Sequence, residues 1–190
     1  MSYVVLKYSP ISEYSLNFIV SGSKSISQRA LIINSLIDFK GRMINLSNSE
    51  DTKILNQCLS NYNSTLNVYN SGTSLRFLLS FFALKNQEVT LFGDPYLFKR
   101  PIQLLIDYLN KLGANIFKKG NKIVIKKGKL LGGVLVLKPM KTSQFISSLL
   151  LIAPYLNGGI KLFFPQKTHS QSYIQMTVDM LNRCGVSIKK

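Results

Sequence analysis

The stretch Ser21-Gly22-Ser23-Lys24-Ser25-Ile26-Ser27-Gln28-Arg29 sets how the first helix of this chain begins, and later parts of the chain repeat its design. Glycine and serine disfavour regular structure, and a serine here can cap a first helical turn. The apolar run Ala30-Leu31-Ile32-Ile33 then carries a helix, predicted over residues 25–36, into a core. Lys24 and Arg29 could converge on one small anion with the free N–H groups of the helix start. The alternative is a capped helix with two solvated cations.

Composition indicates a globular chain of one or two domains, because 46% of its 190 residues are hydrophobic. The net charge is +16, from 24 Lys and Arg against 8 Asp and Glu. That charge admits nucleic acid, anionic lipid or a phosphorylated small substrate as partner. The lysines are scattered, however, and no basic block is interleaved with aromatic residues as in a base-stacking surface. Drift in an AT-rich genome would also enrich lysine.

The sequence gives little support for a membrane span, a signal peptide, a metal site or a Ser-His-Asp triad. The longest apolar runs, residues 77–84 and 149–155, are too short to span a bilayer, and the N-terminus does not resemble a signal peptide. The two cysteines, Cys58 and Cys184, fall in predicted helices and lack metal-ligand spacing, so we expect free, partly buried thiols in a reducing cytoplasm. The single His169 argues against a histidine-built metal site or a Ser-His-Asp triad.

Helices and strands alternate in an α+β pattern that is repeated about three times. Helices are predicted over residues 25–36, 49–59, 75–84, 101–112, 145–156 and 173–183, and strands over 3–8, 15–20, 43–46, 66–69, 88–92, 115–118, 122–127, 134–137 and 160–164, with residues 186–190 barely a strand. Asp107–Ile116 aligns with Asp179–Ile188, and Thr73-Ser74 aligns with Thr142-Ser143. Such units must share a core. If a rotation relates them, their polar helix-start loops can gather into one anion site.

Five motifs in order resemble those of the enolpyruvylshikimate-phosphate synthase family. They are the stretch at Ser21–Arg29, Asn70-Ser71-Gly72-Thr73-Ser74-Leu75-Arg76, Lys99-Arg100-Pro101-Ile102, Thr142-Ser143-Gln144-Phe145 and Ser170-Gln171-Ser172-Tyr173-Ile174. Ser71, Thr142 and Ser172 stand where the family has alanine, serine and proline. A related enzyme that acts on a UDP-sugar has Lys-Asn after the loop glycine and a reactive loop cysteine. Lys24-Ser25 and the lack of cysteine in residues 85–100 favour the shikimate enzyme.

The resemblance implies transfer of the enolpyruvyl group of phosphoenolpyruvate to shikimate 3-phosphate, in the shikimate pathway to chorismate and the aromatic amino acids. It implies a cytoplasmic transferase that needs no cofactor and no metal. Two anionic substrates must be held together despite their repulsion, and clustered lysine and arginine side chains meet that demand. The second hypothesis, from another class, is a non-catalytic basic protein that keeps the fold and binds nucleic acid.

The resemblance also assigns substrate-binding roles residue by residue. Shikimate 3-phosphate would be bound by Lys24, Ser25, Arg29, Thr142, Ser143, Gln144, Ser170 and Tyr173, and phosphoenolpyruvate by Lys24, Gly72, Arg100 and Gln144. Gly72 would let the backbone approach the ligand closely. Thr73 and Arg76 would support the loop. The open alternatives are a turn glycine at 72, a loop serine at 170 and a core aromatic at 173.

The resemblance covers the N-terminal half of the family chain, whose fold is an inside-out α/β barrel of two similar domains. Residues 1–20 would be strands of the other, mostly absent domain, and residues 21–190 a substrate-binding domain of three units, the last incomplete. The other domain supplies the acidic residues for proton transfer. We therefore expect no catalytic residue in this chain, inactivity of the chain alone, and the C-terminal half as a possible separate partner.

Overall fold

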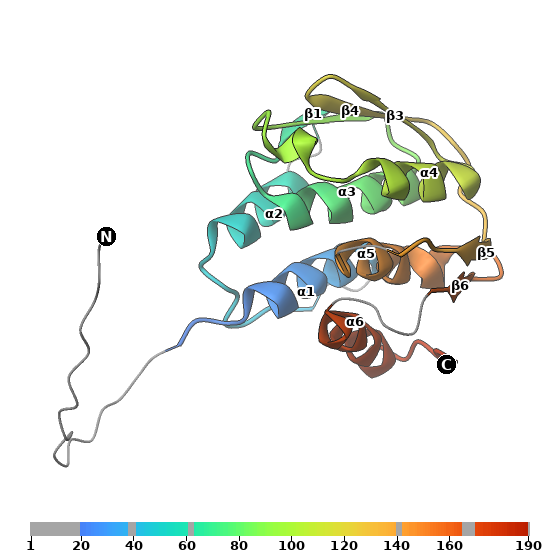
Figure 1. The fold of residues 1–190 in the computed structure, drawn as a ribbon. Helices are drawn as coiled ribbons and strands as arrows, with labels where there is room; N and C mark the ends of the chain where they lie inside the picture. Colours follow the sequence, from blue (N-terminus) through green and yellow to red (C-terminus); the bar gives the residue numbers. More distant parts are fainter. Residues whose placement is uncertain (1–19, 38–40, 61–62, 140–141, 165–169, 190) are drawn as a thin grey trace, which may run out of the picture.

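The computed structural model describes residues 20–37, 41–60, 63–139, 142–164 and 170–189 (Figure 1). In chain order the elements are α1 (Lys24–Leu36), α2 (Glu50–Ser60), β1 (Thr65–Asn67), α3 (Gly72–Lys85), β2 (Val89–Phe92), the 3-10 helix η1 (Leu97–Lys99), α4 (Gln103–Lys111), β3 (Asn115–Lys119), β4 (Lys122–Lys126), β5 (Gly133–Val136), α5 (Gln144–Ile152), the 3-10 helix η2 (Ala153–Tyr155), β6 (Ile160–Phe163) and α6 (Gln171–Arg183).

The strands form two sheets. The larger has the order β1-β2-β4-β3, with β1 parallel to β2 and the other neighbours antiparallel, and the smaller pairs β5 with β6 in parallel. In the larger sheet Leu66 pairs with Leu91, and Leu91 with Ile123. All three are buried, because alternate side chains of a strand point to one face. That face packs on helices, so the sheet has one apolar side.

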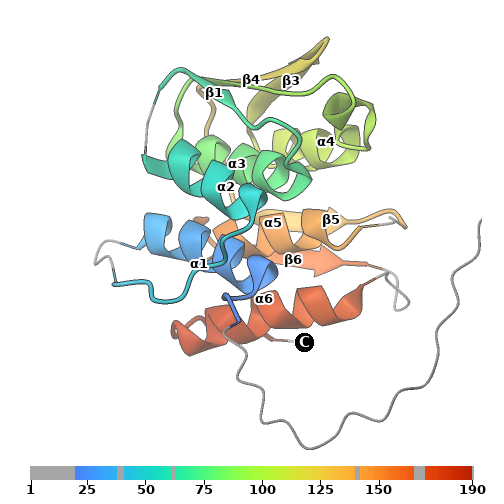
Figure 2. The same cartoon turned by 90° about the vertical axis from the view of Figure 1, so that its left-hand side faces the viewer.

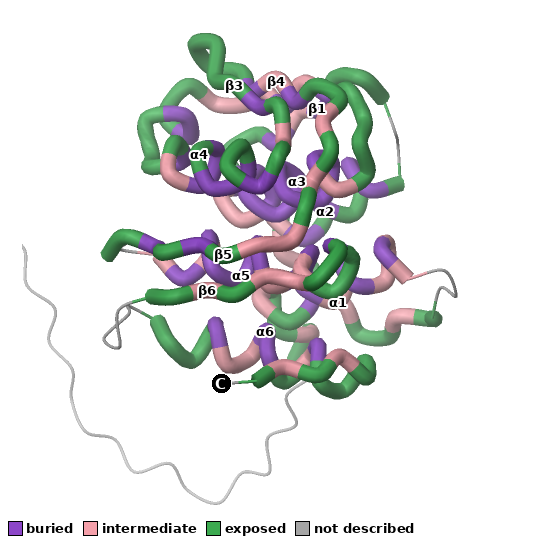
Figure 3. Tube along the Cα trace, turned by 90° about the vertical axis from the view of Figure 1, so that its right-hand side faces the viewer, coloured by how far each residue is buried: buried purple, intermediate pink, exposed green. Residues whose placement is uncertain are grey.

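Helix α3 is the central element. Every residue from Ser74 to Ala83 is buried, as expected for a helix that is apolar on all sides. It packs against α2, α4 and α5, while α1 packs on α2 and α6 packs on α5 and α1. Figure 2 shows the resulting order: the four-stranded sheet, a layer with α2, α3 and α4, a layer with α1, α5 and the β5–β6 pair, and then α6. Figure 3 shows that buried residues are concentrated in the helices of these layers.

Two parts of the fold have the same plan. Parallel strands β1 and β2 are joined by α3, and parallel strands β5 and β6 by α5. The glycines that the sequence alignment pairs, Gly113 and Gly185, both follow a helix with positive φ, +99° and +84°. Such a left-handed residue is a common helix end, and glycine adopts it without a Cβ clash. The three-unit division stays a prediction, and the strands predicted within residues 1–19 lie outside the described residues.

Several sequence-based boundaries are wrong. Residues 43–46 do not form a strand, because Asn45 has a φ of 55° and leaves the extended conformation. The helix predicted over residues 145–156 ends at Ile152 and continues as η2, where Pro154 lacks an N–H donor. Residues 186–189 form no strand. The sequence predicts that both cysteines lie within helices and are partly buried. Cys58 is buried within α2, whereas Cys184 lies just beyond α6 and is exposed.

Candidate substrate-binding site

One cavity lies where the first turns of four helices meet. Its volume is about 280 Å³, and α1, α3, α5 and α6 all begin at its wall. The lining residues are Lys24, Ser25, Gln28, Arg29, Thr73, Thr142, Ser143, Gln144, Ser170 and Tyr173. Free N–H groups and the positive ends of helix dipoles favour anions at helix starts. Among the described residues of its lining there are two cations, several hydroxyl groups and no carboxylate, so the cavity is suited to a small, hydroxylated anion.

The cavity brings together all eight residues that the sequence predicts for shikimate 3-phosphate. Two further residues in its lining, Gln28 and Thr73, have no binding role in the sequence-based assignment. Thr73 accepts a hydrogen bond at 2.9 Å from the Gln144 side chain, which in turn reaches across from α5 to α3. Gln28 and Thr73 both belong to the quoted motifs, where Gln28 directly precedes Arg29 and Thr73 directly follows Gly72. These neighbouring positions are the sequence feature from which a binding role could have been predicted for them.

Arg29 is more firmly held than an ordinary anion ligand. It is 3% exposed, and its Nε donates to Thr177 Oγ1 at 2.7 Å. Its Nη1 donates to the backbone oxygen of Ser25, and its Nη2 donates to Ser147 Oγ and to the backbone oxygen of Tyr173. Burial lowers the pKa of Arg29 to about 10, and Tyr173 acts in the opposite direction. Arg29 is therefore still a cation at neutral pH, although most of its donors are used within the protein.

The start of α6 supplies the outer wall of the cavity. Tyr173 is 42% exposed, so the alternative of a core aromatic residue is wrong. Its ring lies 6.0 Å from the Arg29 guanidinium carbon, within range of a cation–π contact. Ser170 occupies the position before the helix with a φ of 59°, and its side chain makes no capping bond to the first turn. Its hydroxyl can therefore serve a ligand.

Two predicted phosphoenolpyruvate residues, Gly72 and Arg100, lie outside the cavity lining, beside Arg76. Arg76 donates to the backbone oxygens of Gly72 at 2.7 Å and Pro101 at 2.9 Å, so it supports the loop at Gly72 and also ties it to the loop at Pro101, a link that the sequence does not indicate. Desolvation, and then the charge of Arg100, lower the pKa of Arg76 to about 10. Within the described chain neither arginine has an ion-pair partner, and Arg76 Nε is buried without a hydrogen bond. An anion here would offset this repulsion.

The space around residue 72 explains why it is glycine. A Cβ at this position would lie 2.7 Å from Arg76 Nη1 and 3.4 Å from Arg100 Nη1. The glycine thus leaves room for two guanidinium groups at the start of α3.

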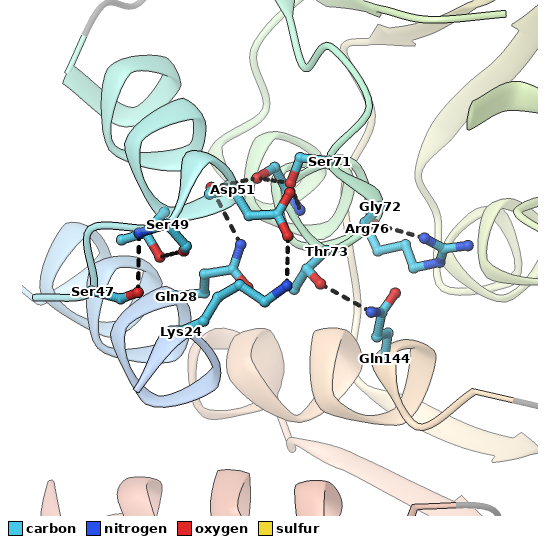
Figure 4. A network of polar contacts seen from close by, with 12 residues as sticks. Lys24, Gln28, Ser47, Ser49, Asp51, Ser71, Gly72, Thr73, Arg76 and Gln144 are labelled. Atoms are coloured by element: carbon cyan, nitrogen blue, oxygen red, sulfur yellow. Dashed lines mark hydrogen bonds and ion pairs between the residues drawn. The ribbon is translucent and has the colours of Figure 1, made fainter. Parts of the chain in front are cut away.

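Lys24 extends from the start of α1 to the start of α2. Its Nζ lies 2.8 Å from Asp51 Oδ2, which is the sole ion pair within the described part of the chain (Figure 4). The sequence indicates Asp51 only as an acid at a helix start, because nothing local points to a partner 27 residues away.

Two other kinds of feature are absent from the described residues. No group of three histidine, cysteine, aspartate or glutamate side chains there is placed to bind a metal ion. Among the same residues, no helix has the length and apolar character required to cross a bilayer.

Known proteins match this chain over most of its length. The family model for EPSP synthase (3-phosphoshikimate 1-carboxyvinyltransferase) matches residues 54–190. A 3-phosphoshikimate 1-carboxyvinyltransferase of Bacteroides fragilis (strain YCH46) is 34% identical over 169 residues, covering 87% of this chain and 41% of the relative. The enzyme of that name from Buchnera aphidicola subsp. Schizaphis graminum is 31% identical and covers 96% of this chain and 50% of the relative.

The fold matches as well. The solved structure of EPSP synthase from Acinetobacter baumannii aligns with a TM-score of 0.78 and 23% identity, over 91% of this chain and 44% of that one. This likeness confirms the predicted α+β, enolpyruvyl transferase type of fold. The chain spans about half the length of the curated relatives it matches. Because the family model matches residues 54–190, which is more than half of the chain, the chain belongs to the EPSP synthase family.

Proposed function

We propose that this chain forms the shikimate 3-phosphate side of an enolpyruvyl transfer site. The observation that carries the proposal is the cavity at the four helix starts, lined by all eight residues that the family motifs assign to this substrate. Hydroxyl groups of Ser25, Thr142, Ser143 and Ser170 suit a sugar-like acid, and Lys24 and Arg29 suit its charges. The whole reaction would transfer the enolpyruvyl group of phosphoenolpyruvate and release phosphate.

Phosphoenolpyruvate would bind next to this cavity, at the pair Arg76 and Arg100 beside Gly72. Arg100 would bind it directly, and Arg76, already bonded to the loops, would hold the site open. Lys24 and Gln144 would lie between the two substrates, since both line the cavity and Gln144 also bonds to Thr73 at the start of α3. Two anions placed side by side need such shared cations to offset their repulsion.

The remaining half of the relatives' length would supply the acid–base groups and close over the substrates, either in the same polypeptide or as a separate chain. The family assignment does not favour the alternative of a nucleic-acid-binding protein. We also propose a cytoplasmic location, which suits the free thiols Cys58 and Cys184.

Calorimetric titration of shikimate 3-phosphate into the purified chain tests the proposal. The parent should bind, and Lys24→Ala should weaken binding by about 1–3 kcal/mol, as expected for hydrogen bonds to charged groups. Lys53→Ala is the matched control, because Lys53 is an exposed lysine of α2 that does not line the cavity. Equal affinities for the parent and Lys24→Ala would contradict the assigned site.

A further inference from the structure

The carboxylate of Asp51 approaches Lys24 from outside the cavity. Lys24 lines the cavity, whereas Asp51 does not, although Nζ and Oδ2 are 2.8 Å apart. The Lys24 side chain is 50% exposed and the Asp51 side chain 28% exposed. Figure 4 shows the Lys24 side chain running past Thr73 toward Asp51, with Gln144 facing Thr73 from α5.

Asp51 itself is fixed by three helices. It lies in the first turn of α2, where a negative charge is favoured by the helix dipole. Its backbone oxygen accepts hydrogen bonds from Gln28 Nε2 of α1 at 3.3 Å and from Ser74 Oγ of α3 at 3.1 Å. Ser71 Oγ donates to that serine hydroxyl at 2.6 Å. The carboxylate is thus attached to a rigid point between α1, α2 and α3.

Lysine needs such an anchor more than arginine does. Its ammonium is a point charge on a flexible four-carbon stem, with three N–H donors. The bond to Asp51 uses one donor and leaves two. Arg29, by contrast, is held by bonds from three of its nitrogens. Lys24 has no comparable set of contacts, since Asp51 is its only hydrogen-bond partner within the described residues.

We propose that Asp51 is a positioning residue, which holds the Lys24 ammonium at the cavity so that its two remaining donors face the bound anions. The inference rests on the proposed function for the identity of those anions. Two effects oppose each other when the carboxylate is removed. The anions lose a repulsive charge, but that charge lies outside the cavity and is partly screened by solvent. The Lys24 side chain gains conformational entropy when its partner is lost, and ligand binding must then order that side chain again. The second effect dominates.

The variant Asp51→Asn tests the proposal because it removes the charge and keeps the backbone oxygen that Gln28 and Ser74 use. The affinity for shikimate 3-phosphate should fall by about 3- to 10-fold, from the ordering of one long side chain. Glu50→Gln is the matched control. It makes the same change of charge in the same helical turn, on an exposed residue outside the Lys24 ion pair, and should bind like the parent.

A double-mutant cycle separates positioning from support of the fold. If Asp51 acts through Lys24, Asp51→Asn should change the affinity by less than about twofold in the Lys24→Met background. An undiminished loss in that background would show a structural role. Unchanged or tighter binding by the single variant Asp51→Asn would also overturn the proposal.

The ammonium signal of Lys24 provides a test that needs no substrate. In the ¹⁵N spectrum of lysine-labelled protein, this signal is the one missing from Lys24→Met. It should be observable in the parent and in Glu50→Gln, and lost through fast solvent exchange in Asp51→Asn. A signal unchanged in Asp51→Asn would overturn the proposal. If the parent fails to bind shikimate 3-phosphate, the proposed function is contradicted, and the ammonium signal alone decides whether Asp51 positions Lys24.

Discussion

Arg29 Nε donates to Thr177 Oγ1 at 2.7 Å, a bond that joins α1 to α6 across 148 residues of sequence. Ser147 of α5 completes the contact, since its Oγ lies 2.9 Å from Arg29 Nη2 and 3.0 Å from Thr177 Oγ1. Thr177 and Ser147 are both fully buried. One cation at the cavity therefore holds together three of the helices whose first turns form the site.

The variant Thr177→Val should destabilise the protein. Valine has nearly the same shape but cannot accept the Arg29 hydrogen bond, so a buried charged donor loses its partner. The free energy of unfolding should fall by about 1–3 kcal/mol, measured by urea denaturation followed by circular dichroism. Thr177→Ser, which keeps the hydroxyl, should lose less. A Thr177→Val protein as stable as the parent would show that this bond does not hold α6 in place.

The variant Gly72→Ala should affect phosphoenolpyruvate selectively. The added methyl would meet Arg76 Nη1 at 2.7 Å, so Arg76 must move and its bonds to Gly72 and Pro101 must distort. In a complete enzyme with both halves, the apparent KM for phosphoenolpyruvate should rise by about 10-fold or more, corresponding to at least 1.4 kcal/mol. The KM for shikimate 3-phosphate should change little.

Gly41→Ala is the control for that experiment, because its Cβ would make only an ordinary contact, 3.8 Å from Asn34 Oδ1. Both KM values should then match those of the parent. Equal increases in both KM values for Gly72→Ala would mean that residue 72 serves the fold rather than the phosphoenolpyruvate site.

The two cysteines should differ in reactivity. Cys58 is 4% exposed, and burial raises the pKa of its thiol to about 11, so at pH 8 only about one molecule in a thousand carries the thiolate. Cys184 is exposed. A disulfide reagent at pH 8 should therefore label one thiol quickly in the folded protein and both in urea. Cys184→Ser should abolish the fast phase of labelling. A fast phase that persists in this variant would contradict the assignment of the reactive thiol to Cys184.

The helix starts of the site could be read from the sequence, because each motif puts small polar residues directly before an apolar run. Lys24, Thr142 and Ser170 mark the starts of α1, α5 and α6 for this reason. The networks that fix these side chains could not be read. The partners Ser147 and Thr177 of Arg29 lie 118 and 148 residues away, and no local pattern distinguishes them from other polar residues in buried helices.

The same limit explains the errors. Residues 43–46 are mostly apolar, but a strand also needs a neighbour to pair with, and the backbone at Asn45 turns into the left-handed region instead. The pairing of Lys24 with Asp51 depends on how α1 and α2 pack. Their packing is a property of the whole fold, whereas periodicity and capping are properties of single segments.

The 190 residues alone should show no enolpyruvyl transfer. The reaction must protonate the methylene carbon of phosphoenolpyruvate and remove a proton from the accepting hydroxyl, which needs positioned acid–base groups. The cavity lining in the described residues contains no aspartate, glutamate or histidine, and Arg29, whose pKa is about 10, stays protonated at neutral pH. Lys24 is the one lining amine, and it is paired with Asp51.

A phosphate-release assay with both substrates at high concentration tests this expectation, on chain purified from a host that lacks its own enzyme. The rate should equal the background for the parent and for Lys24→Met alike, while the full-length relative from Bacteroides fragilis serves as the positive control. Mixing in a separately made C-terminal half should restore turnover if closure over the cavity supplies the missing groups. Turnover by the parent chain that disappears in Lys24→Met would instead show that this half carries a complete active site, with Lys24 as its proton-transfer group.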